Sequence, residues 1–520
     1  MNVIFSTQSD SLSLFHALSL RLSRQLGGGA RGFTLSDSWH YSNWTKRNQD
    51  FEREGYFLLP EWELTDRKIL VGEPDFGLIN QYERELGGPG LFGAIVSDRR
   101  ILFGPNCTYS QDYRRRFTDD ELLLLLQHSL VRVDGMFASV KPHLVVTFIC
   151  VTILDYLVYL FAKARGIRFL NLRTSRISNY VNFSSTLNDP SPELLASLEN
   201  CKRDSYVVSD PVTSYIAKFR EGLNKYEGVV APSASPAQKV TFRLPRIPIS
   251  AARFLKIWWK YRASLAATDN HCPGLVKPLV YKGIVNRFRA KIVKLFLKPH
   301  YGTPSTQLRQ RFAFFPLHTE PEVSLLVYSR PLINQIEIVR SVALSLPADM
   351  FLVVKEHPWM VGKRKLSFYL KLLNIPKVIL SPPETAARTW VESSSLIITI
   401  ASSVALEAVM LKRPVVTFGH VPMNALSEKM VRRCQDLTNL PQILRSAIND
   451  HDHDELELSR YVSAVMNYSV PVNLYTVLLG RTNGFSGESS TFDEDIQVLA
   501  EYLIGIIKTV PPKAPNGPDW

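Results

Sequence analysis

The stretch LIITIASSVALEAVMLKRPVVTFG, residues 396–419, decides the fold of this chain. It opens with an apolar run of strand length, passes through two serines into a pattern with helical spacing, and closes with a second apolar run. A strand, a helix and another strand in this order predict a βαβ unit whose two strands lie parallel in one sheet. Strands that are apolar throughout indicate that helices cover both faces of that sheet.

The same alternation extends upstream from this stretch. The predicted strands are RFAFFPLH, MFLVVKEHP and KVILSP, and the predicted helices between them are NQIEIVRSVALSLP, KLSFYLKLLNIP and ETAARTWVESS. Strands and helices that alternate in this way predict a doubly wound α/β domain. We assign this domain to residues 310–485.

The first half of the chain predicts a second domain of the same class. VIFST is followed by a helical pattern that ends at a glycine, and KPHLVVTFIC, LDYLVYLFAKARG and IRFLNL repeat the order strand, helix, strand. A chain of 520 residues is long enough for two or three domains. The sequence therefore predicts an α/β protein with two Rossmann-like domains that face a cleft, the first over residues 1–235.

The most apolar segment, residues 143–166, is the one candidate for a membrane span. Asp155 stands in its middle, and a charge there costs about 2.5–3.5 kcal/mol on insertion scales. We therefore expect a buried strand, a turn and a helix. The start of the chain, MNVIFSTQSD, lacks the apolar run of a signal peptide.

The segment between the two domains, residues 236–309, is predicted to be a basic linker with a helical insertion. Residues 251–300 hold eleven Lys and Arg but one acid, Asp269, a balance of +10 in a chain whose net charge is +13. Aromatic and aliphatic residues alternate with these charges, which is typical of amphipathic helices at an anionic membrane surface. An insertion that packs its apolar stripe on the protein fits equally well, whereas nucleic-acid binding lacks a supporting motif. Residues 486–508 predict a helix that packs back on the first domain, and residues 509–520 a tail without fixed structure.

Several classes of protein are disfavoured by what the sequence lacks. Its five cysteines are scattered and form no CxxC pair, which suits a reducing compartment and argues against a zinc site. GGGARG, residues 27–32, follows a helix and so is not a dinucleotide fingerprint. No P-loop, GxSxG or HExxH motif is present.

Three polar segments follow predicted strands of the second domain: residues 316–322, 355–358 and 401–408. Ligands of open α/β sheets bind beyond the carboxyl ends of the strands, so these segments predict one shared ligand-binding rim. The predicted binding side chains are His318, Glu320, Lys355, His357, Ser402, Ser403 and Glu407.

Each predicted side chain has a chemical role at such a rim. Ser402 or Ser403 is a natural helix N-cap, and a helix N-terminus attracts a phosphate. His357 and Lys355 are expected to face phosphate oxygens, and Glu407 to accept hydrogen bonds from sugar hydroxyls. A plain helix cap and an ordinary first-turn acid are the alternatives for the serines and for Glu407.

Taken together, the segments of residues 310–420 resemble the capsular polysaccharide synthesis family of bacterial glycosyltransferases, which includes Kdo (3-deoxy-manno-octulosonic acid) transferases. RTSRISN, residues 173–179, is a weaker family landmark in the first half. The resemblance implies a GT-B architecture, in which the first domain takes the acceptor and the second the nucleotide-sugar donor.

The resemblance also implies roles for particular residues. His357 matches the histidine that contacts the donor phosphate in related transferases, Ser402 and Ser403 match their serine pair, and Glu407 matches their helix acid. Ala401-Ser402 stands where many relatives have Gly-Thr or Gly-Ser. The acceptor-side candidates are Arg173 and Arg176. The catalytic base is left open between Asp10, Glu73 and Asp75, with His357 also counted among the catalytic candidates.

The resulting prediction is a glycosyltransferase that moves a sugar from a nucleotide donor, CMP-Kdo or similar, to a capsular polysaccharide or glycolipid acceptor. It needs no metal and no cofactor on this interpretation. It is expected in the cytoplasm, peripheral to the inner membrane through residues 251–300, without a nucleic-acid partner. The alternatives are an enzyme related to nucleotide-sugar epimerases and a non-catalytic capsule export or assembly protein.

Overall fold

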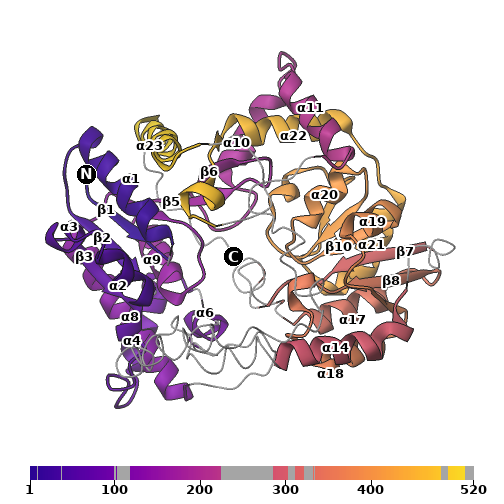
Figure 1. Cartoon of the computed structure of the whole chain (residues 1–520), viewed down its shortest axis with the longest axis horizontal. Helices are drawn as coiled ribbons and strands as arrows, with labels where there is room; N and C mark the ends of the chain where they lie inside the picture. The colour runs from indigo at the N-terminus through magenta and orange to yellow at the C-terminus, as the bar shows by residue number, and fades with distance from the viewer. Residues whose placement is uncertain are drawn as a thin grey trace, which may run out of the picture.

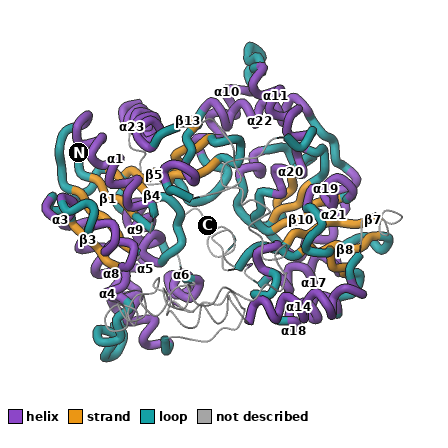
Figure 2. The backbone as a smooth tube through the Cα atoms, in the orientation of Figure 1, coloured by secondary structure: helices purple, strands orange, loops and turns teal. Residues whose placement is uncertain are grey.

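A computed structural model gives the structure of the chain. It describes residues 1–98 except Ser9, Asp37 and Pro89, then Ile101, 117–223, 285–302, 311–320, Ser329, Leu332, 334–481 and 490–509. Figure 1 shows two bodies, each built on its own sheet, with helices α10, α11 and α22 at the top of the view. Figure 2 shows strands inside each body and helices around them.

The first sheet has seven strands in the order β13-β6-β5-β4-β1-β2-β3. β1 to β5 lie parallel, whereas β6 and β13 are antiparallel additions at one edge. The strands are β1 (Val3–Ser6), β2 (Arg31–Leu35), β3 (Phe57–Pro60), β4 (Leu144–Thr147), β5 (Arg168–Thr174), β6 (Tyr180–Ser184) and β13 (Val470–Pro471).

The second sheet has six parallel strands in the order β12-β11-β10-β7-β8-β9. This is the strand order of a doubly wound nucleotide-binding fold, so the predicted fold class is confirmed. The strands are β7 (Arg311–Pro316), β8 (Met350–Lys355), β9 (Val378–Ser381), β10 (Leu396–Thr399), β11 (Val415–Thr417) and β12 (Val431–Arg433).

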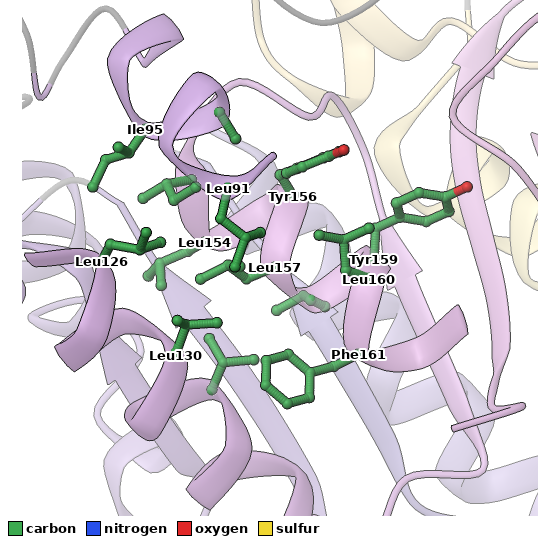
Figure 3. Close-up of a cluster of buried hydrophobic side chains, with 14 of the residues drawn as sticks. Leu91, Ile95, Leu126, Leu130, Leu154, Tyr156, Leu157, Tyr159, Leu160 and Phe161 are labelled. Atoms are coloured by element: carbon green, nitrogen blue, oxygen red, sulfur yellow. The ribbon is translucent and has the colours of Figure 1, made fainter. Parts of the chain in front are cut away.

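Helices cover both faces of the first sheet. One face packs on α5 (Phe76–Glu85), α6 (Leu91–Ser97), α8 (Asp119–Val140) and α9 (Ile153–Ala164). Leucines and aromatic residues of α6, α8 and α9 interdigitate in this core (Figure 3). The opposite face packs on α1 (Ser11–Leu26), α23 (Phe492–Thr509) and the π-helix η9 (Leu474–Leu478). The remaining short helices of this body are α2 (Ser38–Thr45), α3 (Asp50–Arg53) and α4 (Glu61–Leu64).

The apolar segment at residues 143–166 forms β4, a turn and α9, as predicted. Asp155 accepts the backbone N–H of Thr152 in a capping box at the start of α9, so the charge that argued against a membrane span stabilises a helix terminus. Among the described residues no helix is long and apolar enough to cross a membrane.

The second sheet is covered in the same manner. One face packs on α19 (Ala387–Ser393), α20 (Val404–Met410) and α22 (Glu455–Asn467), and the other on α14 (Asn286–Leu297), α17 (Gln335–Ser345), α18 (Leu366–Leu373) and α21 (Leu440–Asn449). Short 3-10 helices in the described part of this body include η4 (Lys298–His300), η6 (Pro358–Met360), η7 (Pro422–Ala425) and η8 (Leu437–Asn439).

The chain passes between the bodies at places other than the predicted boundaries at residues 235 and 485. α10 (Pro192–Cys201) and α11 (Asp210–Arg220) already pack in the core of the second body, against α22 and α20. The chain returns at β13, which pairs with β6, and α23 then packs on α1. The crossovers depend on long-range packing, which chain order does not reveal. Residues 236–284 and 510–520 lie outside the described residues, so much of the predicted insertion and nearly all of the predicted tail are not described.

Candidate active site

The strand order of the second sheet reverses between β7 and β10, and polar groups meet there. His318 follows β7 and Ala401 follows β10. Nε2 of the buried His318 accepts the backbone N–H of Ala401 at 3.2 Å, so the N–H of the neutral ring is on Nδ1. In doubly wound folds the ligand crevice lies at this reversal of strand order.

The segment after β8 lies on the same rim. β8 is the neighbour of β7, and the backbone N–H of Leu317 donates to the carbonyl of Lys355 at 2.8 Å. The strand order thus sets the polar segments after β10, β7 and β8 side by side along one edge of the sheet.

His357 begins the 3-10 helix η6 at this rim. Its Nδ1 accepts the backbone N–H of Trp359 at 3.2 Å, so the proton of the neutral ring is on Nε2. Its own backbone N–H donates to the Glu356 carboxylate at 2.7 Å. These two bonds fix the loop and leave a half-buried imidazole at the edge of the sheet.

A buried ion pair between Arg364 and Glu356, which the sequence analysis did not predict, supports this loop. Arg364 is 1 % exposed and donates to both carboxylate oxygens of Glu356, at 3.0 and 3.2 Å, and to the carbonyl of His318 at 2.7 Å. Tyr369 donates its hydroxyl to the same carboxylate at 2.9 Å. Burial raises the pKa of Glu356, while Arg364, the Tyr369 hydroxyl and the His357 N–H act in the opposite direction. The pair joins the β7 and β8 ends of the rim.

Glu320 belongs to this supporting layer. Its carboxylate lies 3.7 Å from the Arg364 guanidinium and accepts the Gln335 amide at the start of α17. The Gln335 side chain also accepts the backbone N–H of His318 at 2.7 Å.

The expectation that Lys355 faces phosphate oxygens differs from the structure. Its side chain is buried, and Nζ donates to the carbonyl of Pro383 at 2.9 Å and to that of Glu356 at 3.4 Å. Burial lowers the pKa of this ammonium to about 8. As the last residue of β8, Lys355 points into the layer beneath the rim and ties the β8 loop to the segment after β9.

Ser402, and not Ser403, caps α20 with its side chain; the sequence predicted this role for either serine. Its Oγ accepts the backbone N–H of Val404 at 3.2 Å, whereas Ser403 makes no side-chain cap. Both serines are half-buried at the rim. α20 spans seven residues, so its dipole is that of a short helix.

Glu407 lies one turn further along α20. Burial raises the pKa of its carboxyl from 4.5 to about 7, and Arg388 of α19 opposes this shift. A carboxyl that titrates near neutrality suits hydrogen bonding to hydroxyl groups in either protonation state.

The candidates for a catalytic base lie in the first body. Asp10 follows β1 and starts α1, with Arg481 Nε 3.0 Å from its carboxylate and His40 Nδ1 at 3.7 Å. The strand order of the first sheet reverses between β1 and β4, and Gln8 spans this point by donating to the carbonyl of Ile149 at 2.6 Å. Asp10 therefore stands beside the ligand-binding position of its own sheet.

Glu73 and Asp75 occupy a different place. Asp75 caps α5 by accepting the backbone N–H of Leu78 at 2.9 Å, and Glu73 is exposed two residues earlier. In the described part of the chain no hydrogen bond or ion pair joins either residue to the other site candidates.

The two acceptor-side arginines differ from each other. Arg173 is inside the first body and pairs with Asp189 at 2.7 Å, with Nε donating to Asn171 at 2.9 Å, so its guanidinium has a structural role. Arg176 is exposed in the β5–β6 turn with φ +67°, a conformation that costs free energy for a side chain other than glycine.

A polar link between the bodies runs through a histidine that the sequence analysis did not select. His420 follows β11; its Nδ1 lies 3.2 Å from the carbonyl of Asp189, and its Nε2 lies 2.9 Å from Arg433. His420 stands directly after an apolar strand, so the rule that selected His318 and His357 would have found it too.

Among the described residues no three His, Cys, Asp or Glu side chains gather in a way that could hold a metal ion. The residues of both rims are instead hydrogen-bond donors and acceptors with a few cations.

Comparisons with known proteins can now be placed beside this geometry. Residues 306–425 match the family model described as capsule polysaccharide biosynthesis protein. A search of curated proteins found no significant match.

Several solved structures match the chain at low similarity. The β-Kdo 2,7 transferase KpsC of Thermosulfurimonas dismutans is 12% identical, with 71% of this chain and 89% of that chain covered and a TM-score of 0.33. The β-Kdo 2,4 transferase of the same organism is 13% identical over 63% and 81%, with a TM-score of 0.32. The UDP-GlcNAc 2-epimerase of Methanocaldococcus jannaschii, in complex with UDP-GlcNAc and UDP, is 13% identical over 90% and 99%, with a TM-score of 0.26. Scores this low carry no argument about activity.

The matched segment runs through β7, β8, β10 and β11 and includes every predicted donor-binding residue. Through residues 306–425, the chain is similar to capsule polysaccharide biosynthesis proteins.

Proposed function

We propose that the protein is a glycosyltransferase of capsule synthesis, which moves a sugar from a nucleotide-sugar donor to a polysaccharide or glycolipid acceptor. The donor is CMP-Kdo or a similar nucleotide sugar and binds at the rim of the second sheet. The reaction takes place at the cytoplasmic face of the membrane.

One observation carries this proposal: the His318–Ala401 hydrogen bond joins the strand ends on either side of the strand-order reversal. This bond holds the serine segment after β10 against the segment after β7, next to the strand-order reversal at which doubly wound folds generally bind nucleotides. The family match of residues 306–425 adds the context of capsule synthesis.

The rim supplies hydrogen-bond donors at the place where the leaving phosphate develops negative charge. The half-buried imidazole of His357 lies at this rim, and the Ser402 hydroxyl, whose oxygen accepts the Val404 N–H, can still donate its own O–H. Ser403 adds a second hydroxyl. Donors fixed in advance stabilise a leaving group without reorganisation, and this electrostatic stabilisation is the main effect asked of the second body.

The first body supplies the acceptor side. Asp10, with His40 beside it, is the candidate base that takes the proton of the acceptor hydroxyl. Arg176 presents an exposed guanidinium to an anionic acceptor. On this proposal the fixed donors and cations act without a metal or cofactor.

The test begins with donor binding. A thermal-shift screen of CMP-, UDP- and GDP-sugars should show one class that raises the melting temperature, because a ligand bound to the native state stabilises it by mass action. Replacement of His357 by Ala should weaken that shift and lower transfer by about 10²-fold or more. His128→Ala, at a half-buried histidine on α8, is the matched control and should change neither.

Three results would redirect the assignment. Full transfer activity of His357→Ala would remove the rim from the mechanism. Conversion of the donor to an epimer without acceptor would identify an epimerase-like enzyme. Absence of any nucleotide-sugar binding would favour a non-catalytic role in capsule export or assembly.

A further inference from the structure

Helix α14, Asn286–Leu297, has two apolar faces. Ala290, Val293 and Leu297 are at most 3 % exposed and pack on the second body. Phe288, Leu295 and Phe296 are 64, 73 and 59 % exposed. Residues seven and eight positions apart share one side of an α-helix, so these three form a single outward stripe. Burial of the inward stripe stabilises the fold, whereas the exposed outward stripe adds no such burial.

The charge around the outward stripe has one sign. Residues 285–300 contain five Lys and Arg and no Asp or Glu. Arg287, Lys291 and Lys298 are exposed, and Lys294 pairs with Glu384 of the second body. An exposed aromatic stripe flanked by long cationic side chains is the pattern of helices that lie in the interface of an anionic bilayer.

We propose that α14 is a membrane-docking helix whose outward stripe, Phe288, Leu295 and Phe296, inserts among the headgroups of an anionic bilayer. The charges select this occupant: α14 itself carries only cations, of which Lys294 is paired with Glu384, and anionic lipids complement the exposed Arg287, Lys291 and Lys298. Figure 1 shows α14 at the lower edge of the second body, beside α18.

The position of α14 relates this surface to the donor rim. A Cβ on Gly362 would lie 2.1 Å from the carbonyl oxygen of Asn286, so the first turn of α14 touches the turn that follows η6. Ala290 and Val361 are buried together at the same contact. A helix held by a bilayer would therefore present the His357 loop close to the membrane, where a glycolipid acceptor resides. This step deepens the proposed function, although the docking itself requires neither donor nor transfer.

The experiment measures binding of the full chain to vesicles of phosphatidylglycerol and phosphatidylethanolamine, and to vesicles of phosphatidylcholine alone, by flotation. The wild type should bind the anionic vesicles more tightly, with binding weakened by salt. The triple variant Phe288→Ser, Leu295→Ser, Phe296→Ser should reduce the partition coefficient about tenfold or more. Arg287→Gln, Lys291→Gln, Lys298→Gln should remove the preference for anionic lipid.

The first body offers a matched control. Phe76 at the start of α5 is 59 % exposed, equal to Phe296, and Val71 is 76 % exposed, but Glu73 and Asp75 lie between them. The double variant Val71→Ser, Phe76→Ser should bind vesicles as the wild type does. Circular dichroism and donor thermal shifts of each variant separate loss of docking from loss of fold or of the donor site.

Specific outcomes would overturn the proposal. Unchanged vesicle binding by the apolar triple variant would move any docking away from α14. Equal loss in the Val71/Phe76 control would reduce the effect to general hydrophobicity. Concentration-dependent dimers in sedimentation that disappear with the triple variant, in a protein that ignores vesicles, would assign the stripe to a second copy of the chain.

Discussion

Nε2 of His318 accepts the backbone N–H of Ala401 at 3.2 Å, across the reversal of strand order in the second sheet. A side chain in the segment after β7 thus holds the backbone of the segment after β10. This bond fixes the serine segment after β10 relative to the segment after β7. Its removal is the most direct way to perturb the rim.

Replacement of His318 by Leu should leave the buried Ala401 N–H unpaired. A buried donor without a partner costs about 1–3 kcal/mol, so urea denaturation should show a loss of that size. Donor affinity should fall as well, because the backbone at Ser402 is released. His318→Gln, which keeps an acceptor at the same reach, should recover much of both. Equal behaviour of the Leu and Gln variants would show that the bond does not position the rim.

Removal of Arg364 should be more damaging than removal of any exposed ion pair. Arg364→Met leaves the Glu356 carboxylate buried without its cation, which typically costs about 3–5 kcal/mol. The double variant Arg364→Met, Glu356→Met removes both charges and should be more stable than the Arg364 variant. Calorimetric melting of the set measures the effect; a double variant less stable than Arg364→Met would contradict it.

The hydrogen bonds of His420 should stabilise the contact between the two bodies. His420→Ala removes the partner of the Asp189 carbonyl and of Arg433, so amide hydrogen exchange of residues 186–189 should accelerate. The loss of stability should be about 1 kcal/mol, the usual net value of a hydrogen bond. His420→Asn retains an N–H near the position of Nδ1 and should protect those amides better than Ala. Identical exchange in the wild type and both variants would remove His420 from the interface.

The fold was accessible from the sequence because apolar runs and helical spacing alternate without interruption from Arg311 to Gly419. Crossovers of one hand limit the topologies that such an alternation allows, but they do not fix the order of the strands. The positions at which the chain passes from one body to the other could not be predicted from the sequence. α10 and α11 read as ordinary amphipathic helices, and what they pack against is set by residues more than 180 positions away, such as Met410 at the Arg220 side chain.

The candidate site was accessible only in part for a related reason. Position after a strand selects a residue for the rim, as it did for His318 and Ser402, but does not tell where the side chain points. Lys355 ends its strand on the inner side and donates to carbonyls beneath the rim. Arg364 lies among Gly362, Lys363 and Lys365 in a segment that reads as exposed, yet it is the buried partner of Glu356.

Gly362 should tolerate no side chain, for two separable reasons. Its φ is +81°, which disfavours any residue with a Cβ, and that Cβ would lie 2.1 Å from the carbonyl oxygen of Asn286. Gly480→Ala is the control for the first reason, since Gly480 has φ +60° but no atom within 4 Å of a built Cβ. The control should lose about 1 kcal/mol and Gly362→Ala clearly more, measured by urea denaturation. Equal losses would show that α14 does not press on the turn after η6.

The carboxyl of Glu407 should make stability fall as pH rises from 4.5 towards 7. Burial raises its pKa in the folded protein to about 7, against 4.5 ordinarily, so the native state holds this proton over a range in which the unfolded chain has released it. A native state that binds more protons loses stability with rising pH.

Glu407→Gln removes this dependence and should stabilise the protein by about 1–3 kcal/mol at pH 8, and by little at pH 4.5. The comparison is the difference in unfolding free energy between variant and wild type at the two pH values. Glu392→Gln, which lies exposed beside Arg388 on α19, is the control and should show no such gain. A difference between Glu407→Gln and the wild type that stays constant with pH would mean that the carboxyl titrates at its ordinary value.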